Sequence, residues 1–154
     1  MKTLRSRALI LALALAGVAA AQSAADRGSA REKLIGAWHL IAIEAPGPNG
    51  KVVRDAAVTG SLIYTRDGHM SVQLMYPASE SGLSNDYVKN GYEASFGHYD
   101  VDEAAHTVTH HVEGSITPGL VGKDLTRGFR FVDGRLIIQS TQADEHWSVT
   151  WAHN

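Results

Sequence analysis

The chain has 154 residues, with 14 lysines and arginines against 16 aspartates and glutamates, and a formal net charge of −2 at pH 7. This charge argues against nucleic acid or an anionic membrane surface as the partner. The sequence contains no cysteine. Disulfides and a lipidated N-terminal cysteine are therefore excluded, and the domain must be stable through its hydrophobic core alone.

The first 21 residues have the pattern of a secretory signal peptide. Three basic residues lie within the first seven positions, an Ala/Leu/Ile run starts at Ala8, and Ala19 and Ala21 form an A-x-A cleavage site before Gln22. We expect a periplasmic or secreted protein without membrane insertion after cleavage. Cleavage leaves 133 residues with 11 basic and 16 acidic side chains, a net charge of −5, which is enough for one domain with a core.

Residues 22–33 are small and polar and are predicted to form a flexible tether, followed by one domain over residues 34–154. In that domain, short β-type runs alternate with turn signals, and helical periodicity is almost absent. Eight strands are predicted: Ala37 to Glu44, Ser61 to Thr65, His69 to Tyr76, Ala94 to Val101, His106 to Glu113, Leu125 to Val132, Arg135 to Thr141 and Glu145 to Ala152.

Tight turns are expected at Asp67-Gly68, Asp102 to Ala105 and Asp133-Gly134, because glycine supplies the positive φ that such turns need. Eight antiparallel strands joined in this way commonly close into an up-and-down barrel, which removes exposed sheet edges. The fold class is thus predicted as all-β, an eight-stranded antiparallel barrel.

Two longer connections interrupt the pattern. The segment Ala45 to Gly60 is expected to be a Pro/Gly-rich loop able to cover a barrel mouth. The segment Pro77 to Gly91 is expected to contain one short helix with Ser84 as its N-cap and Gly91 at its C-terminal end.

The stretch "TVTHHVEGS" places two histidines side by side in a predicted strand. Adjacent strand residues point to opposite faces, so His110 and His111 cannot share one site. Pairing Val101 with His106 and Tyr99 with Val108 sets His110 on the apolar face, inside the barrel, and His111 outside.

The same exercise on the other two hairpins gives further candidates for the interior. A two-residue turn at Asp133-Gly134 pairs Phe131 with Leu136 and places Arg127 inside, where it needs an acceptor. A three-residue turn with a bulge would shift that register. At Asp67-Gly68, one turn type places Tyr64 and Met70 inside with Gln73 outside, and the two-residue alternative turns Gln73 inward.

Four segments, "LIGAWHLIAIE", "GSLIYTRDGHMSVQLM", "GYEASFGHYDVDEAAHTVTHHVEGS" and "LVGKDLTRGFRFVDGRLII", together resemble the bacterial and fungal lipocalin-like domain proteins. Gly36-Ala37-Trp38 is similar to the G-x-W signature of lipocalins, whose tryptophan closes one end of the barrel. The resemblance implies an eight-stranded barrel around a small apolar ligand. Some similar proteins accompany secondary-metabolite pathways, where the barrel can act as an isomerase or cyclase.

Other kinds of site are disfavoured by spacing. The eight histidines make a zinc site conceivable, with His98, His111 and Glu113 as its best candidates, but no spacing matches a known zinc pattern. The G-x-S-x-G elbow of a nucleophilic serine is also missing. We therefore expect no metal and no cofactor.

The leading hypothesis is an exported protein that binds a small, largely apolar or aromatic ligand inside the barrel. Its predicted ligand-binding residues are Tyr64, Met70, Tyr99, His110 and Arg127. The alternative is an isomerase or cyclase that acts on an aromatic or polyketide-like molecule in the same cavity, with His110 as the acid/base group and Arg127 or Tyr99 steadying an oxyanion.

The A-x-A pattern predicts that exported protein begins at or near Gln22. N-terminal sequencing of protein recovered from outside the cytoplasm tests this directly. An intact Met1 in that material would contradict both the signal peptide and the assignment to the periplasm or medium.

Overall fold

A computed structural model of the chain describes residues 28–47 and 49–154. The predicted signal peptide and the first half of the predicted tether, residues 22–27, lie outside the described residues. The last part of that tether differs from the prediction, because Ala30–Leu34 form a short helix, α2. Ser29 caps it by accepting a hydrogen bond from the Glu32 N–H, and Leu34 is fully buried. No helix in the described ranges has the length and apolarity of a membrane span.

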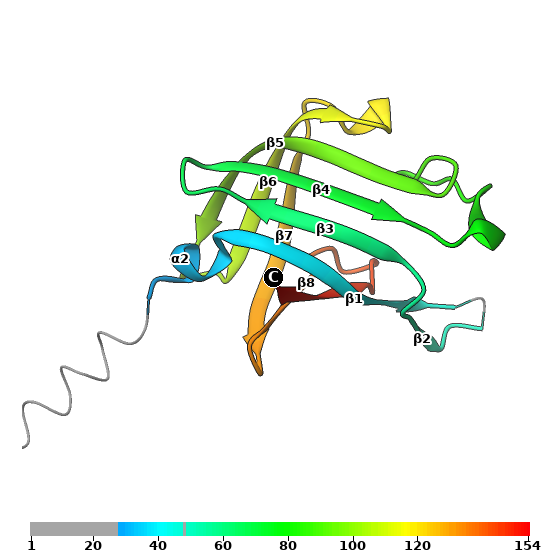
Figure 1. The fold of residues 1–154 in the computed structure, drawn as a ribbon, viewed down its shortest axis with the longest axis horizontal. Helices are drawn as coiled ribbons and strands as arrows, with labels where there is room; N and C mark the ends of the chain where they lie inside the picture. The colour runs from blue at the N-terminus through cyan, green and yellow to red at the C-terminus, as the bar shows by residue number, and fades with distance from the viewer. Residues whose placement is uncertain (1–27, 48) are drawn as a thin grey trace, which may run out of the picture.

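The described residues form an antiparallel barrel (Figure 1). The chain runs through β1 (Gly36–Pro46), β2 (Val52–Asp55), β3 (Thr59–Tyr64), β4 (His69–Met75), β5 (Tyr92–Asp102), β6 (Thr107–Ser115), β7 (Asp124–Val132), β8 (Arg135–Ser140) and β9 (Ser148–His153). From β3 to β9 each strand pairs with the next one in the chain. β1 pairs with both β3 and β9, which closes eight strands into a barrel as predicted.

The structure contains one strand more than predicted, β2, which lies within the segment Ala45 to Gly60 that was predicted to be a long open loop. β2 folds back on the end of β1, so this segment is a hairpin rather than a cover for the barrel mouth. Its valines have high β propensity, and Arg54 lies opposite Glu44 with 2.7 Å between Nη1 and Oε1. Opposite charges facing each other across two strands favour this pairing.

The prediction of a short helix after Ser84 is also wrong, because residues 84–91 form no helix. A 3₁₀ turn, η1 (Ala78–Glu80), forms earlier in the loop instead. The side-chain oxygen of Asn85 accepts hydrogen bonds from the N–H groups of Tyr87 and Val88, and Ser84 Oγ accepts from the Asn90 N–H. These side-chain contacts satisfy the backbone locally and compete with a helix.

Two of the three hairpins follow a predicted register. Asp133-Gly134 is a two-residue turn, which pairs Phe131 with Leu136 and places Arg127 inside. At Asp67-Gly68 Tyr64 pairs with Met70, which is the register of the predicted alternative with a bulge. Gln73 is therefore on the outer face.

The register predicted for the hairpin between β5 and β6 is wrong by two residues. Val101 pairs with Val108 and Tyr99 with His110, because the four-residue turn spans Glu103 to His106, one position later than the predicted Asp102 to Ala105. The Ala105 N–H donates to an Asp102 carboxylate oxygen, and His106 adopts a positive φ of 53°. A shift by an even number of residues leaves every side chain on its predicted face.

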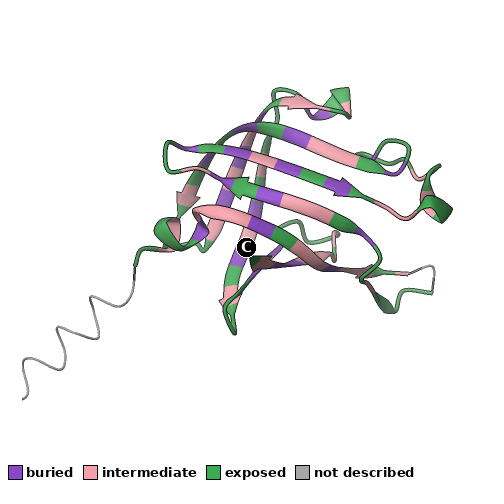
Figure 2. Ribbon diagram, in the orientation of Figure 1, coloured by how far each residue is buried: buried purple, intermediate pink, exposed green. Residues whose placement is uncertain are grey.

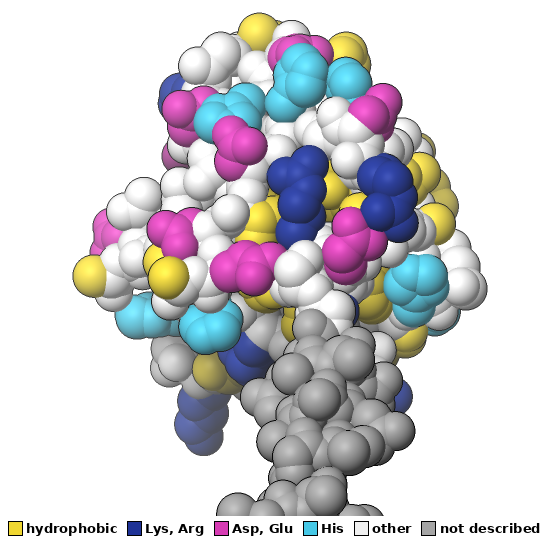
Figure 3. All heavy atoms as spheres, turned by 90° about the vertical axis from the view of Figure 1, so that its left-hand side faces the viewer, with side chains coloured by type: hydrophobic (Ala, Val, Ile, Leu, Met, Phe, Trp, Pro, Cys, Tyr) yellow, Lys and Arg dark blue, Asp and Glu magenta, His cyan; other side chains and the backbone are white. Residues whose placement is uncertain are grey.

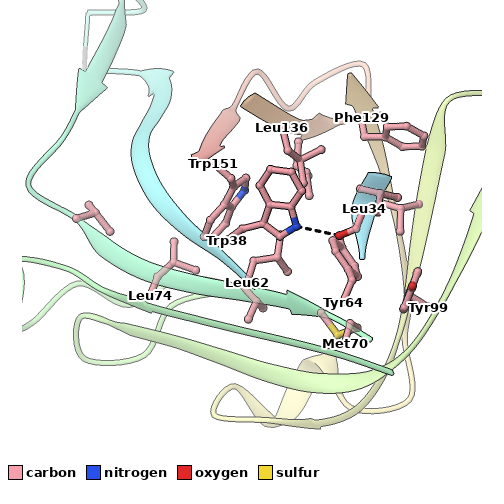
Figure 4. Packing of buried hydrophobic residues seen from close by; sticks show 14 residues of the cluster. Leu34, Trp38, Leu62, Tyr64, Met70, Leu74, Tyr99, Phe129, Leu136 and Trp151 are labelled. Atoms are coloured by element: carbon pink, nitrogen blue, oxygen red, sulfur yellow. Dashed lines mark hydrogen bonds between the residues drawn. The ribbon is translucent and has the colours of Figure 1, made fainter. Parts of the chain in front are cut away.

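Buried residues recur along the barrel strands (Figure 2), and buried hydrophobic side chains pack closely at one end of the barrel (Figure 4). Trp38 lies in this core, and its Nε1–H donates to the carbonyl oxygen of Leu34 at 2.8 Å (Figure 4). Tyr64 and Tyr99 pack nearby with their ring centroids 4.7 Å apart. Helix α2 thus closes this end with Leu34, and Trp38 holds it there.

Replacing Trp38 with phenylalanine should lower the free energy of unfolding by about 1–3 kcal/mol, because the buried Leu34 carbonyl loses its donor. Urea unfolding of the variant and of a control, Tyr92→Phe at an exposed position, measures this loss. A Trp38→Phe variant as stable as the control would show that the hydrogen bond does not hold the helix.

Candidate functional site

The opposite half of the barrel encloses a cavity of about 240 Å³. Its wall is largely aliphatic and aromatic, and includes Ile43, Leu62, Val72, Leu74, Ile138, Val149, Tyr76, Tyr87, Trp147 and Trp151. The polar side chains of the wall are Asn85, Glu93, Ser95, His110 and Arg127. An apolar cavity with a few polar groups is the usual form of a small-molecule site.

The two neighbouring histidines lie on opposite faces of β6, as predicted. His110 is 8% exposed and lines the cavity, whereas the side chain of His111 is 37% exposed and lies outside. The Nε2 atom of His110 lies 2.6 Å from the Tyr64 hydroxyl oxygen. Burial, together with the positive charge of Arg127, lowers the pKa of His110 from 6.5 to about 3. His110 is therefore a neutral imidazole at physiological pH.

Arg127 projects from β7 into the cavity and is 7% exposed. Its Cζ atom lies 5.2 Å from the ring centroid of Tyr87 and 4.9 Å from that of Trp147. Cation–π contacts of this kind stabilise a desolvated guanidinium without using its N–H donors. Tyr87 and Trp147 come from the two loops that border the cavity, so these loops form part of the arginine site.

The structure divides the five predicted ligand-binding residues into two groups. His110 and Arg127 line the cavity. Tyr64, Met70 and Tyr99 face inward but lie in the packed core, because α2 and Trp38 fill their end of the barrel. Tyr64 reaches the cavity indirectly through His110, and the Tyr99 hydroxyl donates to the Thr65 carbonyl oxygen instead. The prediction that Tyr64, Met70 and Tyr99 line the cavity is therefore wrong.

Glu93 is a cavity residue that the sequence reasoning missed. β5 begins at Tyr92, two residues before the predicted strand, and alternation from the inward-facing Gly97 through Ser95 leads directly to Glu93. Burial raises the pKa of this carboxyl from 4.5 to about 7, although Arg127 pulls it down. Among the described residues that line the cavity, Glu93 is the single acidic one.

Glu145 fixes the two aromatic neighbours of Arg127 without forming an ion pair with it. Its carboxylate accepts hydrogen bonds from Trp147 Nε1–H at 2.9 Å, from the Ser140 hydroxyl at 2.8 Å and from the Tyr87 hydroxyl at 3.3 Å. The bonds from Ser140 and Trp147 are the main cause that lowers the Glu145 pKa. The loops on both sides of the cavity are thus joined at this carboxylate.

His98 and His111 on the outer face contact separate sets of acidic side chains. His98 pairs with Glu113, and His111 lies between Asp124 at 2.7 Å and Asp100 at 3.1 Å. The hydrogen bond to Asp124 is the largest cause that raises the pKa of His111. Figure 3 shows histidine and acidic side chains next to each other on the surface. Within the described ranges, no group of three or more such side chains is arranged to hold a metal ion.

A comparison with known families matches residues 35–153 to the lipocalin-like domain. The chain belongs to the lipocalin-like domain family. The comparison with curated proteins found no significant match.

Solved structures similar to this lipocalin-like protein include the fluorescent protein UnaG. The wild-type UnaG structure is 15% identical and has a TM-score of 0.41, with 80% of this chain and 98% of UnaG covered. Two single-residue variants of UnaG are 14% identical, with TM-scores of 0.41 and 0.40. The matches cover 80% and 79% of this chain and 97% and 96% of the respective UnaG chains.

In this lipocalin-like barrel, His110 does not meet the requirements of the acid/base group in the isomerase or cyclase hypothesis. A general acid or base works best when its pKa lies near the working pH. With a pKa of about 3, His110 is not protonated to the imidazolium acid at neutral pH, and its neutral form is a weak base.

The raised pKa of Glu93 predicts that the free energy of unfolding depends on pH. The folded protein binds the Glu93 proton more tightly than the unfolded chain, so this contribution to stability is fully present below pH 4.5 and is lost as the pH rises through about 7. Replacing Glu93 with glutamine should therefore raise the free energy of unfolding at pH 8, by at most about 3 kcal/mol, and change it little at pH 4.

Chemical denaturation at the two pH values measures this difference. Asp86→Asn, an exposed change in the neighbouring loop, is the control and should behave like the unmodified protein at both. An equal effect of Glu93→Gln at pH 4 and pH 8 would contradict the raised pKa.

Proposed function

We propose that this lipocalin-like protein is exported and binds a small, largely apolar ligand inside its barrel. The observation that carries the proposal is the cavity of about 240 Å³ in the half of the barrel that Trp38 and α2 leave open. Apolar walls with a few polar groups favour a ligand that is mostly hydrocarbon and carries a polar substituent. The flat rings of Tyr76, Tyr87, Trp147 and Trp151 in this wall favour an aromatic ligand.

The size of the cavity supports a small ligand. At about 30 Å³ for each water in the liquid, its volume corresponds to about eight water molecules. A molecule with one to three fused rings is therefore the expected size. The export part of the proposal is supported by the basic start, the apolar run and the A-x-A pattern of residues 1–21.

Titration with 1-aminoanthracene, a neutral fluorophore whose emission shifts to the blue in apolar surroundings, tests binding in the cavity. Purified protein should give a saturable blue shift with one site per chain. Ala45 lines the cavity at the end of β1, so Ala45→Trp should fill part of it and weaken binding at least tenfold.

Gln73→Trp adds the same side chain to the outer face of the barrel and should leave the affinity unchanged. Circular dichroism of both variants checks that the barrel is intact. The absence of saturable binding to the unmodified protein, or equal affinity in the two tryptophan variants, would overturn the proposed site.

A further inference from the structure

We infer that the ligand carries an anionic group, of the carboxylate class, and that Arg127 binds it. This inference rests on the proposed function and adds the chemical class of the ligand. The observation that carries it is a guanidinium that is 7% exposed, lines the cavity and forms no hydrogen bond or ion pair with any side chain in residues 28–47 and 49–154. A buried cation is costly unless an acceptor compensates it.

The carboxyl groups of Glu93 and Glu145 do not supply that acceptor. Glu145 directs its oxygens to Ser140, Trp147 and Tyr87, and no Glu145 or Glu93 oxygen lies within 4.0 Å of a guanidinium nitrogen. Glu93 is held largely protonated by its surroundings until the pH reaches about 7. The N–H groups of Arg127 are therefore available to a ligand, with Tyr87 and Trp147 beside the guanidinium.

His110 adds a second donor to the same cavity. Tyr64 is 1% exposed, burial raises its pKa, and His110 is the partner of its hydroxyl among the described residues. The hydroxyl must therefore donate to Nε2, since otherwise its own hydrogen would be buried without an acceptor. A neutral imidazole that accepts at Nε2 carries its hydrogen on Nδ1. No acceptor for Nδ1–H lies in the described part of the chain.

Arg127 and His110 thus both present donors to the cavity, and the donor of Arg127 is cationic. Arginine presents paired N–H groups whose spacing matches the two oxygens of a carboxylate. An aromatic carboxylate would place its ring against the apolar wall and its oxygens on Arg127, with Nδ1–H of His110 as a further donor. A neutral ligand of the same shape would leave the guanidinium unpaired.

The ligand pair 2-naphthoate and 2-naphthamide tests this inference, because the two molecules have the same shape and differ in charge. Each is titrated into purified protein by calorimetry at pH 6, where Glu93 is largely protonated and naphthoate is ionised, and each is also used to displace 1-aminoanthracene. We expect naphthoate to bind at least tenfold more tightly than naphthamide. This comparison uses the unmodified protein and does not depend on the folding of a variant.

Substitutions at two arginines of β7 test whether one side chain causes the preference for naphthoate over naphthamide. Arg127→Met should reduce the ratio of the two affinities to about one, whereas Arg130→Met, on the outer face of the same strand, should leave it unchanged. The 1-aminoanthracene affinity of each variant reports whether its cavity is intact. Retention of the preference in Arg127→Met would overturn the role of Arg127.

The failure of this inference can be told apart from the failure of the proposed function. Equal affinities for naphthoate and naphthamide, with saturable binding of 1-aminoanthracene, would overturn the anionic ligand and leave the apolar site standing. Binding of neither naphthalene ligand nor the fluorophore would overturn both. Acetate that competes as strongly as naphthoate would indicate a bare anion site and contradict a ligand held jointly by charge and apolar wall.

Discussion

The closed sheet is the constraint on which the rest of this structure depends. Because β1 pairs with β9 as well as with β3, all eight barrel strands form a continuous wall, and each strand must send every second side chain inward. A charged residue at an inward position therefore cannot turn to solvent. Arg127, Glu93 and His110 occupy such positions, and their unusual environments follow from closure rather than from any local sequence preference.

The interior is divided along the barrel axis into two halves with different roles. At one end, the bond from Trp38 to Leu34 holds α2 against the aromatic core, and large side chains fill the space. At the other end, the wall is similar in composition but encloses a cavity. Tyr64 and His110 lie at the boundary, so the packed half positions a polar group of the hollow half through one short hydrogen bond.

Alternation along the strands predicts which face a side chain occupies, but not its depth along the barrel axis. Inside and outside were predictable for His110, His111 and Arg127, even though the register of the β5–β6 hairpin was wrong by two residues. Tyr64, Met70 and Tyr99 were misplaced because their depth depends on α2, whose packing has no period-2 signal. Tyr87 comes from an irregular loop whose path depends on side-chain hydrogen bonds such as those of Asn85, which propensities do not reveal.

The pairing of β1 with β9 also has a consequence for how the protein folds. It joins the first and last strands of the domain, so it closes the longest loop in the sheet and gives the fold a high contact order. Before β9 docks, the edges of β1 and β8 are unpaired and open to association with other chains. Val149 and Trp151 of β9 belong to the cavity wall, so the complete cavity exists only when this pairing has formed. A ligand that binds in the cavity would therefore stabilise the closed barrel relative to any form in which β9 is detached.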